Sequence, residues 1–278
     1  MIIGMDIGAT ATKAVAIEGS EIAGMETVKT VGTEASAHLV LDKILQIMGR
    51  DSREVEQIAI SGGGARRIRE TFLNLPIVAV DEIRAIGLGG LTLSGKQQAL
   101  IVSMGTGTAL VVAFEGGKVT KHIGGTGVGG GTIEGLSRWM LGRDQFEVLE
   151  KMAEKGNASK VDLTVADIAG GPVGIVPAEA TASNFGKLKP HACSDDVAAA
   201  IFNMAAQVIG VVTAMAAKAY NLEKDVVLVG KLIQSKKIAE VVRQVAELFQ
   251  VRLCTPENGD YCVAIGAAKA IRQATKKD

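Results

Sequence analysis

The amino-acid sequence predicts an α/β fold of two lobes with a mixed sheet in each lobe. The first reason is that short apolar strands alternate with amphipathic helices along the chain. The second is that two strand–turn–strand units of similar composition, at 2–17 and 99–114, recur in the two halves. No proline-rich linker separates the halves, so we expect the lobes to pack against each other around a cleft, with a boundary near Ser94 and Gly95.

The individual elements follow from apolar runs and helical periodicity. Short apolar runs bounded by turn residues predict strands, and apolar residues at helical spacing predict helices. The expected strands cover 2–5, 14–17, 58–61, 77–80, 99–102, 109–114, 119–123 and 226–229. The expected helices cover 36–48, 83–91, 133–141, 195–220, 238–249 and 261–272. We therefore place residues 1–95 in the first lobe and 96–278 in the second.

Two predicted hairpin tips carry residues that suit a phosphate site. The first turn, Asp6 to Thr10, combines an acid, a glycine and a hydroxyl, and Lys13 lies on the returning strand. The second turn reads SMGTGT from Ser103 to Thr108. Neither turn has the GxxxxGK[ST] pattern, or GxGxxG with an acid some twenty residues further on. Each turn alone is a weak signal, but together they predict that each lobe offers one hairpin tip to a nucleotide.

A glycine run gives the strongest local signal. Residues 124–136 read GGTGVGGGTIEGL, with seven glycines in thirteen residues, and lead into the expected helix at 133–141. Glycines in this number serve a close approach of backbone to another group, because they otherwise only destabilise a fold. Amides that converge at a helix N-terminus bind anions, most often phosphate. A flexible linker would mix in serine and polar residues, whereas an apolar strand precedes this run.

Composition excludes several classes of protein. The formal net charge is zero, so nothing favours nucleic acid or an anionic membrane surface. No apolar run predicts a membrane span, and no secretory leader is evident, so we expect a cytoplasmic protein. The three cysteines, Cys193, Cys254 and Cys262, have no CxxC spacing and are interpreted as reduced thiols.

Several segments resemble a known superfamily. DIGATATK, SMGTGTAL, the glycine run, VVLVGKL and ENGDYCVAIGAAKA resemble the phosphate and adenosine motifs of the actin-like ATPases, whose fold is ribonuclease H-like. More narrowly, the glycine run together with VDEIRAIGLGG and AEATASNFGKL resembles the type II pantothenate kinases. The resemblance covers nearly the whole chain. It implies ATP-dependent phosphorylation of pantothenate to 4'-phosphopantothenate, the first step of coenzyme A biosynthesis, by a cytoplasmic homodimer.

The resemblance and the residue types together imply ATP and Mg²⁺ as cofactors. Lys13 can neutralise a terminal phosphate oxygen, and Asp6 can hold Mg²⁺ directly or through water. The hydroxyls of Thr10 and Thr106 can hydrogen-bond phosphates. So can the backbone amides of three segments, which are Gly8, Gly105 and 130–132.

At the adenosine end, the family has an aromatic residue after the glycine-run helix, and Phe146 matches it, although Phe146 can equally belong to the core. Lys231 occupies the place of a small residue in the family's adenosine loop. The complete predicted nucleotide set is Asp6, Gly8, Ala9, Thr10, Lys13, Gly105, Thr106, Gly130, Gly131, Thr132, Ile133, Glu134, Phe146 and Lys231.

Glu82 is the candidate general base. It follows the expected strand 77–80 and the expected helix N-cap Asp81, which places it in the first turn of a helix at the carboxyl end of a strand. Position alone favours a first-turn acid without chemical role. The resemblance favours the base, because the type II kinases carry a catalytic glutamate in this pattern, seven residues before a glycine that Gly89 matches. Glu82 and Lys13 are therefore the predicted catalytic residues.

The predicted substrate contacts depart from the family in two places. His122 stands where the family has an arginine that binds the pantothenate carboxylate, and histidine cannot form arginine's bidentate fork. Ala109 replaces a serine. A related alcohol, such as pantetheine or pantoate, is therefore an alternative acceptor. The complete predicted substrate set is Glu82, Thr106, Thr108, His122 and Ala180.

Two further alternatives come from other classes. The activator ATPases of 2-hydroxyacyl-CoA dehydratases share the hairpins but place a cysteine in the loop that is the glycine run here, where this chain has none. A regulator that fuses this fold to DNA-binding helices is disfavoured by the zero net charge and by a first phosphate hairpin at residue 2. For the homodimer, the alanine-rich helix 195–220 can provide the interface or be a buried core helix.

Overall fold

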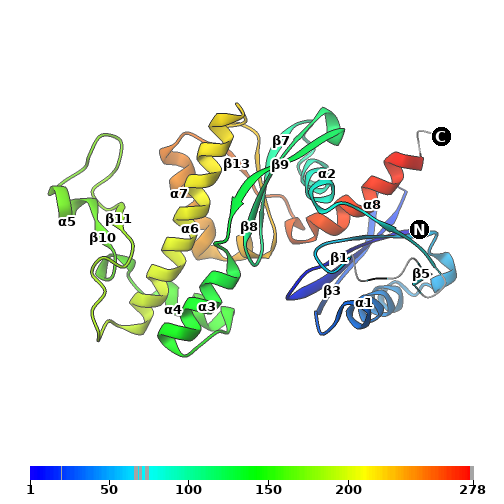
Figure 1. Ribbon diagram of the computed structural model, residues 1–278, viewed down its shortest axis with the longest axis horizontal. Helices are drawn as coiled ribbons and strands as arrows, with labels where there is room; N and C mark the ends of the chain where they lie inside the picture. Colours follow the sequence, from blue (N-terminus) through cyan, green and yellow to red (C-terminus); the bar gives the residue numbers. More distant parts are fainter. Residues whose placement is uncertain (20, 66–67, 69–70, 73–74, 276–278) are drawn as a thin grey trace.

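The computed structural model describes residues 1–275 except 20, 66–67, 69–70 and 73–74, and it has two lobes (Figure 1). The first lobe is built on a sheet of six strands in the order β3-β2-β1-β4-β6-β5. Its strands are β1 (Ile2–Ile7), β2 (Ala11–Glu18), β3 (Glu21–Lys29), β4 (Gln57–Ser61), β5 (Thr71–Phe72) and β6 (Leu75–Ala79). The strand β1 pairs with β2 antiparallel and with β4 parallel, so the sheet is mixed, as predicted.

The two faces of the first sheet are covered by different helices. Side chains alternate along β1, so Ile3 and Met5 face α1 (Thr33–Met48) and join Leu41 and Ile44 in one buried cluster. The opposite face packs against α8 (Cys262–Thr275), because Ala264 of that helix is buried with strand β2. The last helix of the chain thus completes the first lobe.

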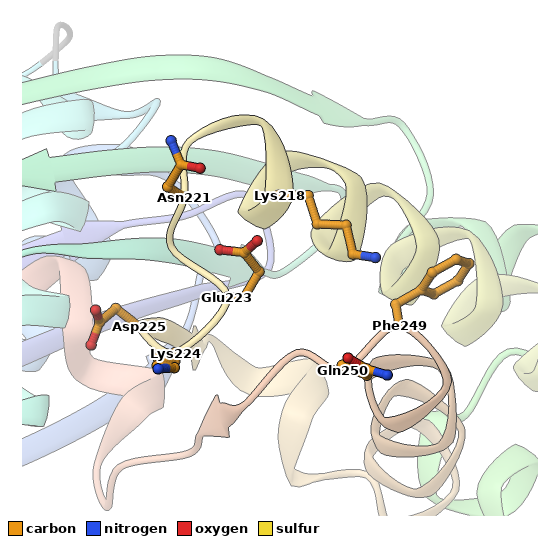
Figure 2. A pocket seen from close by; sticks show the side chains of 7 residues that line it. All are labelled: Lys218, Asn221, Glu223, Lys224, Asp225, Phe249 and Gln250. Carbon is orange, nitrogen blue, oxygen red and sulfur yellow. The ribbon is translucent and has the colours of Figure 1, made fainter.

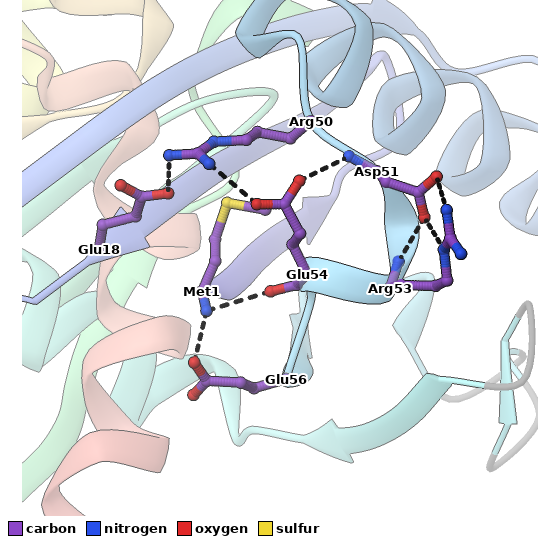
Figure 3. A network of polar contacts seen from close by, with 7 residues as sticks. All are labelled: Met1, Glu18, Arg50, Asp51, Arg53, Glu54 and Glu56. Carbon is purple, nitrogen blue, oxygen red and sulfur yellow. Dashed lines mark hydrogen bonds and ion pairs between the residues drawn. The ribbon is translucent and has the colours of Figure 1, made fainter.

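Salt bridges fix the start of β1 to its surroundings (Figure 3). The amino group of Met1 lies 2.6 Å from Oε1 of Glu56, just before β4. Arg50, after α1, pairs with Glu18 of β2 at 3.2 Å and with Glu54 at 2.9 Å. These pairs are exposed, so each contributes little to stability.

The second lobe has a five-stranded mixed sheet in the order β13-β12-β7-β8-β9. Its strands are β7 (Ala99–Met104), β8 (Thr108–Phe114), β9 (Val119–Thr126), β12 (Val226–Val229) and β13 (Leu253–Cys254). Its helices are α3 (Gly130–Leu141), α4 (Phe146–Lys155), α6 (Ser194–Ala219) and α7 (Lys236–Leu248). Leu100 and Val102 of β7 pack with Phe202 of α6 in the core of this lobe.

The helices α2 (Glu82–Ser94) and α8 cross between the two sheets. A Cβ at Gly89 would collide with the backbone carbonyl of Cys262, and one at Gly266 would collide with that of Ala85. Two helices can approach this closely only where side chains are missing. Gly89, which kept the family's spacing from Glu82, is therefore required by packing. The boundary predicted near residue 95 falls at the end of α2, and the lobe assignment 96–278 stays a prediction, since α8 packs on the first sheet.

A peripheral unit follows α4. It contains β10 (Leu163–Thr164), α5 (Val165–Ala169) and β11 (Thr181–Ser183), and it lies beyond α6, at the end of the molecule opposite the first lobe (Figure 1). Buried Asp162 ties the unit to α6 by accepting a hydrogen bond from Asn203 at 2.8 Å. Within the described residues, α6 alone is long and apolar enough to cross a membrane, and most of it is buried inside the protein, as in a core helix.

Candidate active site

Both hairpin tips border one cavity of about 370 Å³. Thr10 reaches it from the turn between β1 and β2, and Thr106 from the turn between β7 and β8. The complete lining is Thr10, Gly105, Thr106, Gly130, Gly131, Glu134, Phe146, Glu147, Glu150, Lys231, Leu232, Gln234 and Ser235. The cavity therefore brings together most of the predicted nucleotide residues, one from the first lobe and the others from the second.

The glycine run brings the start of α3 against the second hairpin tip. The amide of Gly130 donates to the carbonyl of Gly105 at 2.9 Å, and that of Gly131 donates to the carbonyl of Thr106 at 3.0 Å. A Cβ at Gly129 would lie 2.6 Å from the Thr106 carbonyl oxygen, so a side chain cannot fit. The close approach expected of the glycine run is thus an approach of backbone to backbone.

These contacts change which amides can meet a phosphate. The predicted donors all donate to backbone carbonyls: Gly8, Gly105, Gly130, Gly131 and Thr132. Each can reach a phosphate only by giving up or sharing that bond. Their neighbours are free, because in the described part of the chain the amides of Ala9, Thr10 and Thr106 donate to no carbonyl. We therefore expect these three amides, with the two threonine hydroxyls, to be the first phosphate donors.

Three of the predicted residues are used by the fold itself. The side chain of Ile133 is fully buried in the core of the second lobe. The Thr108 hydroxyl donates to the Val128 carbonyl at 2.9 Å, and the Thr132 hydroxyl donates to the Gly127 carbonyl at 3.0 Å. These bonds shape the glycine turn, and a direct ligand contact of these residues stays a prediction.

Lys13 is almost fully buried beneath the end of the second lobe. Its Nζ donates to the carbonyl of Asp260 at 2.6 Å, lies 3.8 Å from the Asp260 carboxylate and stands 5.6 Å from the centre of the Tyr261 ring. Burial lowers the pKa of Lys13, while Asp260 and Asp6 act to raise it. In the structure the ammonium of Lys13 therefore contacts the segment before α8, and its contact with a phosphate stays a prediction.

Asp6 lies directly opposite Lys13 in the β1–β2 ladder. Burial raises the pKa of the Asp6 carboxyl to about 7; the charge of Lys13 lowers the pKa and that of Glu82 raises it. A buried carboxylate in this position gains from a cation. Among the described residues no group of three or more His, Cys, Asp or Glu could hold a metal ion. One carboxylate nevertheless suits Mg²⁺, which is bound by one or two carboxylates together with substrate phosphates.

Glu82 is exposed in the first turn of α2, and Asp81 caps that turn by accepting from the amide of Arg84 at 3.1 Å. The cap was predicted and is confirmed. The helix runs antiparallel to the edge strand β9, because Leu88 contacts Gly117 and Gly87 lies against Thr120.

The same geometry brings His122 toward the first turn of α2. His122 pairs with Val111, whose side chain is buried with Ile86 of α2, so His122 lies on the α2 face of the sheet. The imidazole is exposed. Glu82 and His122 thus lie on the same side of the second sheet and do not line the cavity, and their contact with an acceptor stays a prediction.

Ala180 is not brought to this site within one chain. It precedes β11, and its carbonyl accepts from the amide of Val165 at 2.8 Å inside the peripheral unit. That unit and the first lobe lie at opposite ends of the long axis (Figure 1). Within one chain the structure therefore places Ala180 in the peripheral unit and away from the first lobe, and its contact with an acceptor stays a prediction.

Phe146 and Lys231, which were predicted for the adenosine end, both line the cavity, and their contact with adenosine stays a prediction. Phe146 also packs on Phe202 with ring centroids 5.4 Å apart, so it belongs to the cavity wall and to the core at once. Sequence reasoning missed five lining residues, namely Glu147, Glu150, Leu232, Gln234 and Ser235. The two glutamates share one helix face with Phe146, and this periodicity was the available signal.

A second hollow, of about 470 Å³, lies at the C-terminal ends of α6 and α7 (Figure 2). Lys218 and Phe249 border it, with the ammonium of Lys218 5.5 Å from the ring centre. It contains none of the predicted site residues, and the candidate active site is therefore the cavity between the hairpin tips.

The sequence matches known proteins over most of its length. A family model described as Fumble matches residues 97–252. The type II pantothenate kinase of Staphylococcus aureus (strain USA300) is 28% identical over 280 residues, which cover 96% of this chain and 98% of that protein. The type II pantothenate kinase of Bacillus cereus (strain ATCC 14579) is 26% identical over 275 residues, which cover 95% and 96%.

Solved structures confirm the fold. The activator of 2-hydroxyisocaproyl-CoA dehydratase from Clostridium difficile with bound ADPNP superposes with a TM-score of 0.68 at 17% identity, covering 100% of this chain and 97% of that one. The ROK hexokinase from Thermus thermophilus superposes with a TM-score of 0.61 at 16% identity, covering 100% and 99%. The two-lobed actin-like ATPase fold predicted from the sequence is thus confirmed.

Proposed function

The chain belongs to the Fumble family, and on this premise we propose that it is an ATP-dependent small-molecule kinase that phosphorylates pantothenate. The observation that carries the proposal is the cavity that both hairpin tips border. The type II pantothenate kinases noted above match nearly the full chain, which supports the same reaction. The product would be 4'-phosphopantothenate, the first intermediate of coenzyme A biosynthesis.

ATP and Mg²⁺ fit the residues present. The hairpin end of the cavity offers the Thr10 and Thr106 hydroxyls and free amides, which suit phosphates, and Phe146 offers an apolar surface for a base. Asp6 would hold Mg²⁺, whose chemistry is to neutralise charge on the transferring phosphoryl group. An ATP analogue is bound in the dehydratase activator of the same fold, which supports this nucleotide class.

The protein's own contribution is to position the acceptor and to remove its proton. We assign Glu82 as the base that accepts the proton of the acceptor hydroxyl, because it is an exposed carboxylic side chain in the first turn of α2. Lys13 would supply positive charge at the first hairpin. The transfer would be direct, without a phosphoenzyme.

The alternative of an activator ATPase lacks a specific observation in its favour. The activators share the fold of this chain at 16–17% sequence identity, and a similarity at this level shows the fold alone. The loop 124–136 has no cysteine to hold a cluster. We therefore do not assign an iron–sulfur role.

We propose that Ala180 contacts the acceptor bound by the second subunit of a homodimer. Because the peripheral unit lies far from its own cleft, Ala180 can contact an acceptor only in the cleft of a second copy. Large apolar side chains are exposed on α3, on α6 and in the peripheral unit, which supports an association through these elements: Trp139, Ile168, Val173, Ile175, Val211 and Met215. The buried positions of α6 are core, and Val211 and Met215 are the large apolar side chains that the helix exposes for an interface.

A comparison of acceptors tests the proposed function. Purified protein with ATP and Mg²⁺ is given pantothenate, pantetheine or pantoate, and ADP release is followed by a coupled assay. We expect acceptor-dependent ADP release with pantothenate. Release that no acceptor stimulates would contradict the kinase assignment, and stimulation by pantetheine alone would shift it to the uncharged acceptor.

The substitution His122→Arg tests the acceptor site directly. If the pantothenate carboxylate lies at residue 122, arginine supplies a bidentate partner and should lower the KM for pantothenate. A hydrogen bond to a charged group contributes roughly 1.5 to 3 kcal/mol, so the gain can reach about ten-fold. With pantetheine the same change should bring no gain, since the guanidinium would face an amide.

The measurement is kcat/KM for both acceptors with wild type, His122→Arg and His122→Ala. A gain with pantothenate alone indicates that the acceptor carboxylate lies at residue 122. High wild-type activity with pantothenate that is lost in His122→Ala would eliminate the pantetheine alternative.

A further inference from the structure

The proposed reaction gives no role to the segment Ser61-Gly62-Gly63-Gly64 at the end of β4. Ser61 is fully buried, and its hydroxyl has no hydrogen-bond partner within the part of the chain that the structure describes. A buried hydroxyl without a partner has lost its bonds to water and gained none in return. Such a group points to a partner that it meets in another state of the protein.

The sheet places Ser61 beside Asp6. The strands β1 and β4 are parallel neighbours, and Ser61 is the direct partner of Asp6 in their register. Partners in register lie on the same face, and strands are about 4.8 Å apart. Ala59, two residues before Ser61, is buried with Ala85 of α2 and Ala267 of α8, so this face is the one covered by α2 and α8.

The next residue touches the same carboxylate. A Cβ at Gly62 would lie 2.6 Å from Oδ1 of Asp6, and Gly62 has φ +91°, which a residue with a side chain rarely adopts. Gly64 lies against Ile7, and its amide donates to the Ile7 carbonyl at 3.1 Å. The glycine turn therefore wraps around the carboxylate end of β1.

We propose that Ser61 is a positioning residue of the phosphoryl-transfer site, whose hydroxyl donates a hydrogen bond to the Asp6 carboxylate when that carboxylate is charged and holds Mg²⁺ with the nucleotide. The bond fixes the direction of the carboxylate, and the glycine turn leaves room for it. This inference rests on the proposed function, since it takes Asp6 as the residue that holds Mg²⁺.

Three proteins test the inference: wild type, Ser61→Ala and the matched control Thr213→Val. Thr213 of α6 also carries a buried hydroxyl without a recorded partner, but it lies in the second lobe away from the cavity. The affinity for ATP is measured by calorimetry with Mg²⁺ and with EDTA, in the absence of any acceptor. The unfolding temperature is measured without ligand.

For Ser61→Ala we expect ATP affinity in Mg²⁺ to fall roughly ten-fold, as for a lost hydrogen bond to a charged group. Affinity in EDTA should not change, and the unfolding temperature without ligand should stay equal or rise. Thr213→Val should keep wild-type affinity, and Ser61→Thr, which keeps a hydroxyl, should restore most of the Mg²⁺-dependent affinity.

Equal Mg²⁺-dependent affinity in wild type and Ser61→Ala would overturn the inference and leave the proposed function intact. An equal loss in Mg²⁺ and in EDTA would also overturn it, because the effect would then be structural. Failure of the wild type to bind ATP at all would instead overturn the proposed function.

Discussion

Glu82→Gln is expected to slow turnover by about 10²- to 10⁴-fold, the usual effect of removing a general base. Glutamine keeps the shape of the side chain and can still hydrogen-bond, but it cannot accept the proton of the acceptor hydroxyl. The affinity for ATP should barely change, because Glu82 does not line the nucleotide cavity. The measurement is kcat with saturating acceptor, alongside the Kd of ATP with Mg²⁺.

Glu34→Gln provides the matched control. Glu34 is likewise an exposed acid in the first turn of a helix, α1, on the other face of the first sheet. If the two variants turn over at similar rates close to wild type, Glu82 is only a first-turn carboxylate and the proposed mechanism is wrong.

Asp6→Asn is expected to stabilise the protein without ligand and to remove the Mg²⁺-dependent part of ATP binding. The folded-state pKa of Asp6 is about 7, above its ordinary 3.8, so burial disfavours the charged form. Below about pH 4 the Asp6 carboxyl is protonated in the folded and in the unfolded protein, and the cost of burying its charge is then absent. As pH rises from about 4 to about 7 the unfolded chain ionises first, so the wild type loses stability in that window.

The difference in unfolding free energy between Asp6→Asn and wild type should therefore grow across pH 4 to 7 and level off above it, at no more than about 4 kcal/mol. Denaturant unfolding at several pH values measures it. A difference in unfolding free energy that does not depend on pH would show that the charge of Asp6 does not destabilise the folded protein. Unchanged Mg²⁺-dependent ATP binding would show that Asp6 does not hold the metal ion.

The sequence was sufficient to predict most elements because their signals are local. Apolar runs located β1, β7, β8 and β12, and the alanine-rich periodicity located α6. The strand β3 was missed because its exposed residues and glycine break the apolar run. The hairpin tips were predicted to lie together, and the cavity confirms this for Thr10 and Thr106.

The remaining features depend on how distant segments meet. Nothing local in the glycine run shows that the amides of Gly130 and Gly131 bond to the second hairpin. The same holds for Lys13, whose buried ammonium meets Asp260 almost at the other end of the chain. The role of Ala180 was predicted from a motif, and a motif does not show where the fold places the residue.

The packing of α8 on the first sheet has a consequence for the order of folding during synthesis. Val15 and Ile17 of β2 are covered by Ala264, Ile265 and Ala268. As the ribosome extends the chain, this apolar face of the first sheet has no cover until α8 has left the exit tunnel. The first lobe is thus translated first, but its core is completed only when α8 emerges. A nascent chain stalled before α8 is expected to expose that apolar face to chaperones and to aggregation.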